Sequence, residues 1–219
     1  MHVSLPNFLN PLFAVLQAVS SINLDNLLKL FEGFKQFHYP GIYEVLHHTV
    51  SLELLDTKGK KAIYRKCQQV RFLQDNVIAY QDLAWGDGKI FASYKCSPGF
   101  PVDRYQEGNC YRTLISLRER KNKGDMSEIN IERSIVDGFV KPIEYFQSQI
   151  EHRTHHMKIE LIFPARRHPK QVVLVQQNSG KTISLSTEHM QILADKRCKL
   201  SWATSTPKLF EAYSLRWQW

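Results

Sequence analysis

The feature that most constrains this chain is a period-two alternation of apolar and polar residues that begins near residue 42 and continues to the C-terminus. Successive side chains of a β-strand point to opposite faces, so an apolar residue at every second position indicates a sheet with one buried face. The clearest series occupy residues 46–54 and 157–163. Turns separate the series and no long helical pattern intervenes, which argues against a βαβ fold.

Turn signals divide this region into about ten or eleven expected strands. The strands are expected at residues 46–54, 61–73, 77–84, 90–96, 111–119, 128–136, 157–163, 172–176, 182–185, 199–203 and 213–219. Residues 141–152 are compatible with a short helix or an extended segment, and residues 97–110 with an irregular loop. The pattern predicts a mainly β fold, an antiparallel β-sandwich that is either one large sandwich or two in tandem.

The turn at 56–59 is expected to lead from strand 46–54 into a return strand at 61–73, and three further turns are expected to join neighbouring strands into hairpins. The Asp-Gly pair at 87–88 and the Asn-Ser-Gly segment at 178–180 are typical of tight hairpins, because glycine readily takes positive φ. The charged segment 120–125 is expected to join strands 111–119 and 128–136. We predict an N-terminal helical hairpin at 1–40, a first β-sandwich region at 41–125 and a second at 126–219.

The last expected strand is the most aromatic. Tyr213, Leu215 and Trp217 share one face with Trp219, and a large apolar face at the end of a chain must be covered. We expect this face and Trp202 to be buried against the strand at 157–163. An exposed aromatic surface for a ligand is the alternative.

Residues 1–40 differ in kind from the rest of the chain. Residues 1–24 contain no Lys, Arg, Asp or Glu, and Asn10-Pro11 is typical of a helix start. Apolar residues then recur at helical spacing and predict two short amphipathic helices. The apolar positions are Leu12, Phe13, Leu16, Val19, Leu24, Leu27, Leu28, Phe31 and Phe34. Two short helices cannot bury so wide a surface within themselves, so we expect another surface to cover it.

Three surfaces are candidates for covering these helices: the β region, a protein partner or second copy of the chain, and a membrane. A membrane span is not expected, because residues 5–24 include Asn, Gln, Ser and two prolines where about 20 mostly apolar residues are needed. We find no secretory leader pattern. The expected location is cytoplasmic, with peripheral membrane contact as one alternative.

The formal net charge of +8 is spread over the chain. The basic residues that could contact a polyanion, such as nucleic acid, form two groups. They are Arg118, Arg120, Lys121 and Lys123, and Arg166, Arg167 and Lys170. Hairpin tips commonly collect solvated charge, so these groups have an ordinary structural explanation as well.

Motifs that carry chemistry are scarce. The sequence has no glycine-rich phosphate loop, no GxSxG nucleophile motif and no CxxC pair. His152 and His156 are weak metal candidates, because residues four apart share a face of a strand. We expect no cofactor, and we expect His47 and His48 to point to opposite faces of a sheet. A disulfide between Cys96 and Cys110 is left open.

These observations predict a non-enzymatic β-sandwich interaction or effector protein. Its apolar N-terminal helices are expected to mediate self-association or membrane contact. The alternative is a basic module that binds a polyanion, such as nucleic acid, through its Lys- and Arg-rich loops. An enzyme with a dispersed catalytic site is a third alternative.

Overall fold

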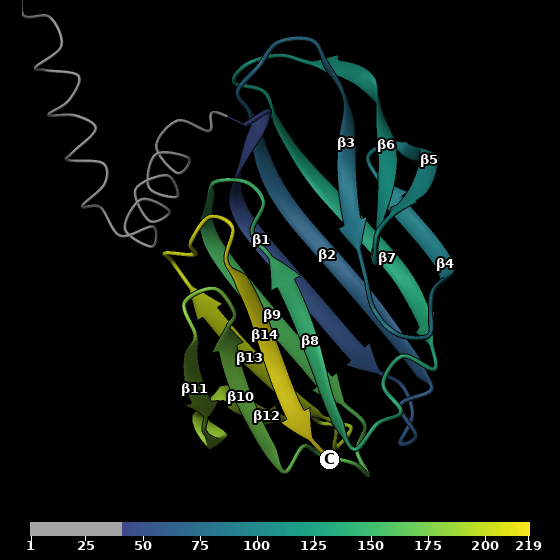
Figure 1. The fold of residues 1–219 in the computed structure, drawn as a ribbon, viewed down its shortest axis with the longest axis vertical. Coiled ribbons are helices and arrows are strands. Elements are labelled where there is room, and N and C mark those ends of the chain that lie inside the picture. The colour runs from purple at the N-terminus through teal and green to yellow at the C-terminus, as the bar shows by residue number, and fades with distance from the viewer. Residues whose placement is uncertain (1–40) are drawn as a thin grey trace, which may run out of the picture. The chain divides into compact units, whose positions relative to one another are not determined.

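The structure is a computed structural model in which residues 41–219 are described, so the expected N-terminal helices lie outside the described residues. The described chain is mainly β, as the alternation predicted, with fourteen strands and one short 3-10 turn at Thr187–His189 (Figure 1). The strands are β1 (Tyr43–Leu54), β2 (Lys61–Phe72), β3 (Val77–Ala84), β4 (Lys89–Ser97), β5 (Phe100–Glu107), β6 (Cys110–Lys121), β7 (Met126–Val136), β8 (Ile143–Gln149), β9 (Thr154–Phe163), β10 (Gln171–Gln176), β11 (Lys181–Leu185), β12 (Met190–Ile192), β13 (Cys198–Thr204) and β14 (Ala212–Gln218).

The strands form three sheets. The largest has seven strands in the order β12-β13-β9-β1-β2-β7-β4, and the smaller ones have the orders β11-β10-β14-β8 and β3-β6-β5. In Figure 1 the four-stranded sheet lies at the lower left and the three-stranded sheet at the upper right. The large sheet takes strands from both sides of residue 125, and residues Gly41–Trp219 form one compact unit.

Strand direction departs from the expected antiparallel arrangement at one pair. β1 and β9 are parallel, whereas the other paired strands of the described region are antiparallel. The prediction is wrong here because no tight turn joins these two strands. The chain between them passes through the two smaller sheets, and so long a connection allows either direction.

Two of the expected hairpins are wrong, whereas β1 and β2 pair as expected across the 56–59 turn. β10 and β11 pair across the 178–180 turn as predicted, but β3 pairs with β6 and β4 pairs with β7. The turn at 87–88 therefore carries the chain from the three-stranded sheet into the seven-stranded one, as does the 120–125 segment. Gly88 has φ of 69°, and a Cβ there would lie 2.3 Å from the carbonyl oxygen of Val136. This turn needs glycine because it packs against another strand.

A bulge in β1 sets which of its residues face the smaller sheets. The register with β2 shifts between Val45 and His47, so Tyr43 and Val45 share a face with His48 and not with His47, as strict alternation would require. On β2 the inner face is one unbroken series of every second residue. That series is Ala62, Tyr64, Lys66, Gln68, Val70 and Phe72. Ala62 and Tyr64, at one end of the series, are buried in one hydrophobic core, and Val70 and Phe72, at the other end, are buried in a second. Both smaller sheets therefore cover the same face of the large sheet.

The first core lies between the four-stranded sheet and the large sheet. We call it the tryptophan core; Trp217 is 1% exposed and meets the Phe163 ring at 5.6 Å between centroids. Tyr213 and Leu215 are also buried, which confirms the expected inward face of the last strand. Trp202 is half-buried and lies 5.3 Å from the Tyr213 ring.

The second core lies between the three-stranded sheet and the large sheet. We call it the tyrosine core, and its buried members are Tyr43, Val45, Val70, Phe72, Val77, Tyr80, Ile115, Leu117, Ile129 and Ile131. One of the two edge strands of this sheet, β5, is exposed along its whole length and occupies the segment expected to be irregular. β8 is the extended form of the segment for which a short helix was the alternative.

Candidate functional site

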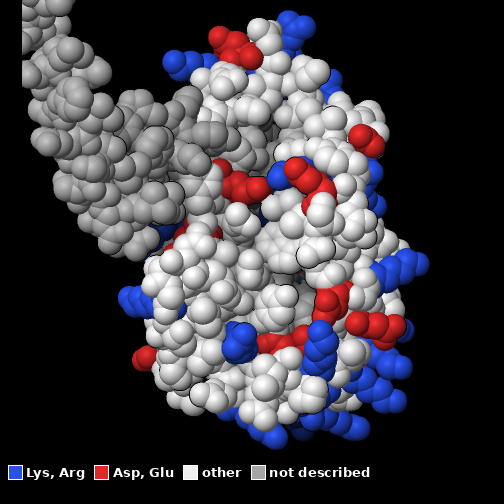
Figure 2. All heavy atoms as spheres, viewed as in Figure 1, with Lys and Arg blue, Asp and Glu red and all other residues white. Residues whose placement is uncertain are grey.

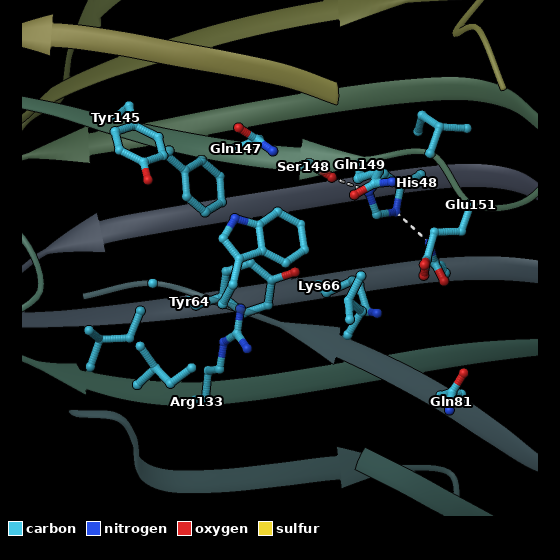
Figure 3. A pocket seen from close by; sticks show the side chains of 18 of the residues that line it. His48, Tyr64, Lys66, Gln81, Arg133, Tyr145, Gln147, Ser148, Gln149 and Glu151 are labelled. Atoms are coloured by element: carbon cyan, nitrogen blue, oxygen red, sulfur yellow. Dashed lines mark hydrogen bonds between the residues drawn. The ribbon is translucent and has the colours of Figure 1, made fainter. Parts of the chain in front are cut away.

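The described region contains a cleft between the two smaller sheets. β3 is an edge strand of one small sheet and β8 is an edge strand of the other, and residues of both line the cleft. Residues of β1, β2 and β7 form its floor (Figure 3). We call this space, of about 100 Å³, the intersheet cleft.

Polar residues occupy the floor at positions where the strand pattern calls for apolar ones. Lys66 and Gln68 belong to the inner series of β2, and Arg133 interrupts the inner isoleucines of β7. Arg133 stands directly opposite Tyr64 in the register between β2 and β7. The sequence analysis did not identify these residues. Lys66 and Arg133 could have been recognised in the sequence, because each is a cation within an otherwise apolar alternating series.

A buried ion pair joins the large sheet to the three-stranded sheet. The Lys66 ammonium lies 2.5 Å from an oxygen of Asp82, whose side chain is only 1% exposed. The Tyr94 hydroxyl donates a hydrogen bond to the other carboxylate oxygen at 3.2 Å. Burial alone would lower the pKa of Lys66, but the Asp82 carboxylate raises it above its usual value. The ammonium is therefore charged and already paired.

A chain of hydrogen bonds crosses the floor from one small sheet to the other. The Tyr80 hydroxyl donates to the Gln68 side-chain oxygen at 2.5 Å, and the Gln68 amide donates to Nδ1 of His48 at 2.7 Å. Nε2 of His48 then donates to the Ser148 hydroxyl of β8 at 2.9 Å (Figure 3). We call these four residues the floor chain. It accounts for both ring nitrogens of His48.

The floor chain requires a neutral imidazole, because a protonated Nδ1 cannot accept the bond from Gln68. Burial, with a smaller contribution from the Lys66 charge, lowers the pKa of His48 to about 3. The ring is thus neutral at physiological pH. His48 is buried and His47 is exposed, so the two do point to opposite faces as predicted.

Arg133 is the exception to this internal pairing. Arg133 is only 6% exposed. Its Nε and Nη1 atoms are buried and have no hydrogen-bond partner in the described region. The centre of the guanidinium lies 4.1 Å from the centroid of the Tyr64 ring and 5.7 Å from that of Phe91. Stacking engages the face of the guanidinium, while its N–H bonds lie in the plane and still need acceptors.

Carboxylates also line the cleft. Burial raises the pKa of Glu144, whose Oε1 accepts a hydrogen bond from the backbone N–H of Lys141 at 2.6 Å. Burial likewise raises the pKa of Glu151, which lies 3.9 Å from the Arg112 guanidinium. Figure 2 shows Asp and Glu atoms near the middle of this face, interleaved with Lys and Arg atoms, and more Lys and Arg atoms at its lower margin.

The structure does not bring the two metal candidates together. The ring of His152 lies 4.2 Å from that of Tyr43 in the cleft, whereas the ring of His156 stacks on His47 at 5.0 Å. His156 precedes the buried Met157, so it points to the other face of the large sheet. No group of three or more metal-ligating side chains occurs within residues 41–219.

The two basic groups lie at opposite ends of the large sheet. Arg118, Arg120, Lys121 and Lys123 lie at or near the connection that enters β7, whose first residue pairs with Arg71 near the end of β2. Arg166, Arg167 and Lys170 follow β9, which ends beside the end of β1. Lys121 is paired with Glu119, and Arg167 stacks on Trp219 at 3.9 Å. They do not form one continuous surface.

The remaining predicted features are placed as follows. The apolar positions proposed for self-association or membrane contact all fall within 1–40, outside the described residues. Cys67, Cys96, Cys110 and Cys198 are free thiols, so the disulfide left open is not formed. In the described part of the chain, no helix has the length and apolar character needed to cross a bilayer.

No protein-family model and no curated protein matches this sequence. Among solved structures, the chain is similar to an M1 zinc metallopeptidase from Deinococcus radiodurans, at 7% identity and a TM-score of 0.47. A variant of that enzyme with a bound Tyr-Ser-Ala substrate is similar at 7% identity and a TM-score of 0.49. Each match covers 79% of this chain but only 42% of the metallopeptidase. These values are too low to transfer a site or an activity to this chain.

Proposed function

We propose that this chain is a non-enzymatic β-sandwich interaction protein. The β-unit of residues 41–219 acts as a binding module through the intersheet cleft. The N-terminal segment, folded as a helical hairpin, mediates self-association or peripheral membrane contact. The observation that carries the first part is the cleft itself, which is open between two sheet edges and carries a buried arginine with unsatisfied N–H groups.

The hydrogen bonds of the cleft favour binding over catalysis. A general base needs a free nitrogen or oxygen within reach of the proton that it abstracts. Both ring nitrogens of His48 are bonded to neighbours, and the Lys66 ammonium is held by Asp82. These groups are fixed in one arrangement, which suits a site that holds a ligand without transforming it.

The apolar composition of the N-terminal segment supports the second part of the proposal. Its nine apolar positions need a cover, and the stretch at 1–24 contains no charged residue. Exposed side chains of this kind stabilise an interface by roughly 1.5–3 kcal/mol each when they become buried. A second copy of the chain or a bilayer surface would supply that burial.

The test replaces Leu16 and Leu28 by Glu in the full chain. We expect the double variant to lose its oligomeric state in light scattering, or its flotation with liposomes, while its β-sheet circular dichroism is unchanged. The matched control, Gln17→Glu with Asn26→Glu, adds the same charge at polar positions and should keep both properties. If the Leu variant instead unfolds as a whole, the segment belongs to the folded core and the proposal fails.

The polyanion alternative has less support, because the two basic groups lie at opposite ends of the large sheet. It makes a separate prediction. If it were correct, nucleic acid would bind the Leu16→Glu/Leu28→Glu variant as well as the original chain, with an affinity that falls steeply with salt.

A further inference from the structure

We propose that the intersheet cleft binds a small planar monocarboxylate. The carboxylate accepts hydrogen bonds from Arg133, and the body of the ligand lies against the surrounding aromatic rings. This inference rests on the proposed function, in which the β-unit is a binding module, and it names the chemical class of the ligand.

The state of Arg133 is the first argument. A buried charge is normally paired or hydrogen-bonded, because removing it from water is otherwise costly. Lys66 follows this rule through Asp82, whereas Arg133 has two buried nitrogens without an acceptor in the described region. A carboxylate supplies two acceptor oxygens in the plane of a guanidinium, which is the geometry that arginine recognises best.

The shape of the cleft is the second argument. Its lining includes Tyr64, Tyr80, Tyr145 and Phe146, and the Tyr64 and Phe146 rings meet edge to face at 5.9 Å between centroids. The free volume of about 100 Å³ is below the roughly 150 Å³ of a closed cavity that accepts benzene, so the part of the ligand inside the cleft is no larger than one ring. A flat ligand with one aromatic ring fits these walls.

The other charges limit the ligand to one negative group. Asp87, Glu144 and Glu151 also line the cleft, so a polyanion would meet three carboxylates. In Figure 3, Arg133 and Glu151 lie on opposite sides of Lys66, so the unsatisfied cation and this acid are separated. A ligand whose single carboxylate sits at Arg133 is kept apart from Glu151.

The test uses the full chain with benzoate as the probe and benzamide as its neutral, nearly isosteric control. We expect benzoate to bind in calorimetry and to shift the Nε–H resonance of Arg133, and benzamide to do neither. Arg133→Gln should weaken benzoate binding about tenfold or more, because a charge-assisted pair is lost. Arg65→Gln, which removes an exposed arginine from the outer face of β2, should leave the affinity unchanged.

Several results would overturn the inference: equal binding of benzamide, no shift of the Arg133 resonance in the original chain, or binding of inorganic phosphate without benzoate. The resonance test does not depend on the folding of any variant.

The Leu16→Glu/Leu28→Glu experiment is independent of these measurements. If assembly is lost as proposed but benzoate does not bind, only the ligand class is wrong. If benzoate binds but the double variant still assembles, the role of the N-terminal segment is wrong and the ligand site stands.

Discussion

The tryptophan core and the intersheet cleft lie on the same face of the large sheet, yet the residues of the core are apolar and many residues of the cleft are polar. On β1 the inner face changes from Leu52 to His48 within four residues, and on β2 it changes from Tyr64 to Lys66 within two. Where the inner residues are apolar, the four-stranded sheet closes over them. Where they are polar, the two small sheets leave a gap. A few side chains therefore decide whether this sheet forms a core or a cleft.

The two regions hold together by different interactions. The tryptophan core gains its stability from apolar area removed from water and from close packing. The cleft floor gains little from apolar burial, and its polar groups, with the exception of Arg133, are tolerated because they are bonded to one another. Each of the following predictions tests this difference, in order of decreasing expected effect.

The largest effect is expected in the tryptophan core. Trp217→Ala should lower the free energy of unfolding by about 4 kcal/mol in urea denaturation, because it leaves a large cavity beside Phe163 and Phe139. Trp217→Phe is the matched control. The indole Nε1 has no hydrogen-bond partner in the described region, so this change removes volume but no bond and should cost much less. Equal losses in the two variants would contradict a packing role.

The polar region should respond to charge and not to volume. Lys66→Met should cost about 3 kcal/mol in the same assay, because the buried Asp82 carboxylate loses its cation and keeps only the hydrogen bond from the Tyr94 hydroxyl. Removing both charges, with Lys66→Met and Asp82→Leu together, should recover most of that loss. A double variant as unstable as the single one would mean that the site is held by packing, like the tryptophan core.

The success of the sequence analysis follows the same division. Alternation located most of the strands and the inward face of β14, because the burial of apolar side chains depends on local pattern, but it missed the exposed β5 and the short β12. It assigned two strand pairs wrongly, since the turns at 87–88 and 120–125 connect different sheets and a turn signal carries no information on sheet membership. The cleft was missed because its members come from β1, β2, β3, β7 and β8, which meet only in the fold.

Acid should weaken the cleft and not the tryptophan core, whose buried members include no histidine. His48 has a pKa of about 3 in the folded chain against 6.5 ordinarily, so the unfolded chain binds the proton first and stability falls as pH falls. Between pH 6.5 and 4.5 this residue should account for a loss of about 2 kcal/mol. The pKa of His152 is lowered by burial to about 4 and adds a loss of the same sign.

Urea denaturation across that pH range checks the assignment. His48→Gln should flatten the dependence by the share of His48, and the slope, not the absolute stability, is the quantity to compare. His47→Gln, at the exposed neighbour, is the control and should leave the slope as it is. A slope unaffected by His48→Gln would place the acid-sensitive group outside the floor chain.

The smallest effect is the most informative about whether the two regions are independent. Tyr80 belongs to the three-stranded sheet and Ser148 to the four-stranded sheet, and the floor chain connects them through Gln68 and His48. Tyr80→Phe removes the donor to Gln68, and Ser148→Ala removes the acceptor for Nε2 of His48. Each should cost about 1 kcal/mol.

Because each bond fixes the orientation of the next, the two losses should not add. Once the Gln68 amide is no longer held by Tyr80, the His48 ring that it orients is less well placed for Ser148. We therefore expect a coupling energy of about 0.5 kcal/mol or more in a double-mutant cycle. The control cycle pairs Tyr80→Phe with Ser214→Ala and should be additive. Ser214 is a buried serine of β14, in the same four-stranded sheet as Ser148, but it does not belong to the floor chain. Additivity in both cycles would mean that the two small sheets are stabilised separately and that the cleft floor transmits nothing between them.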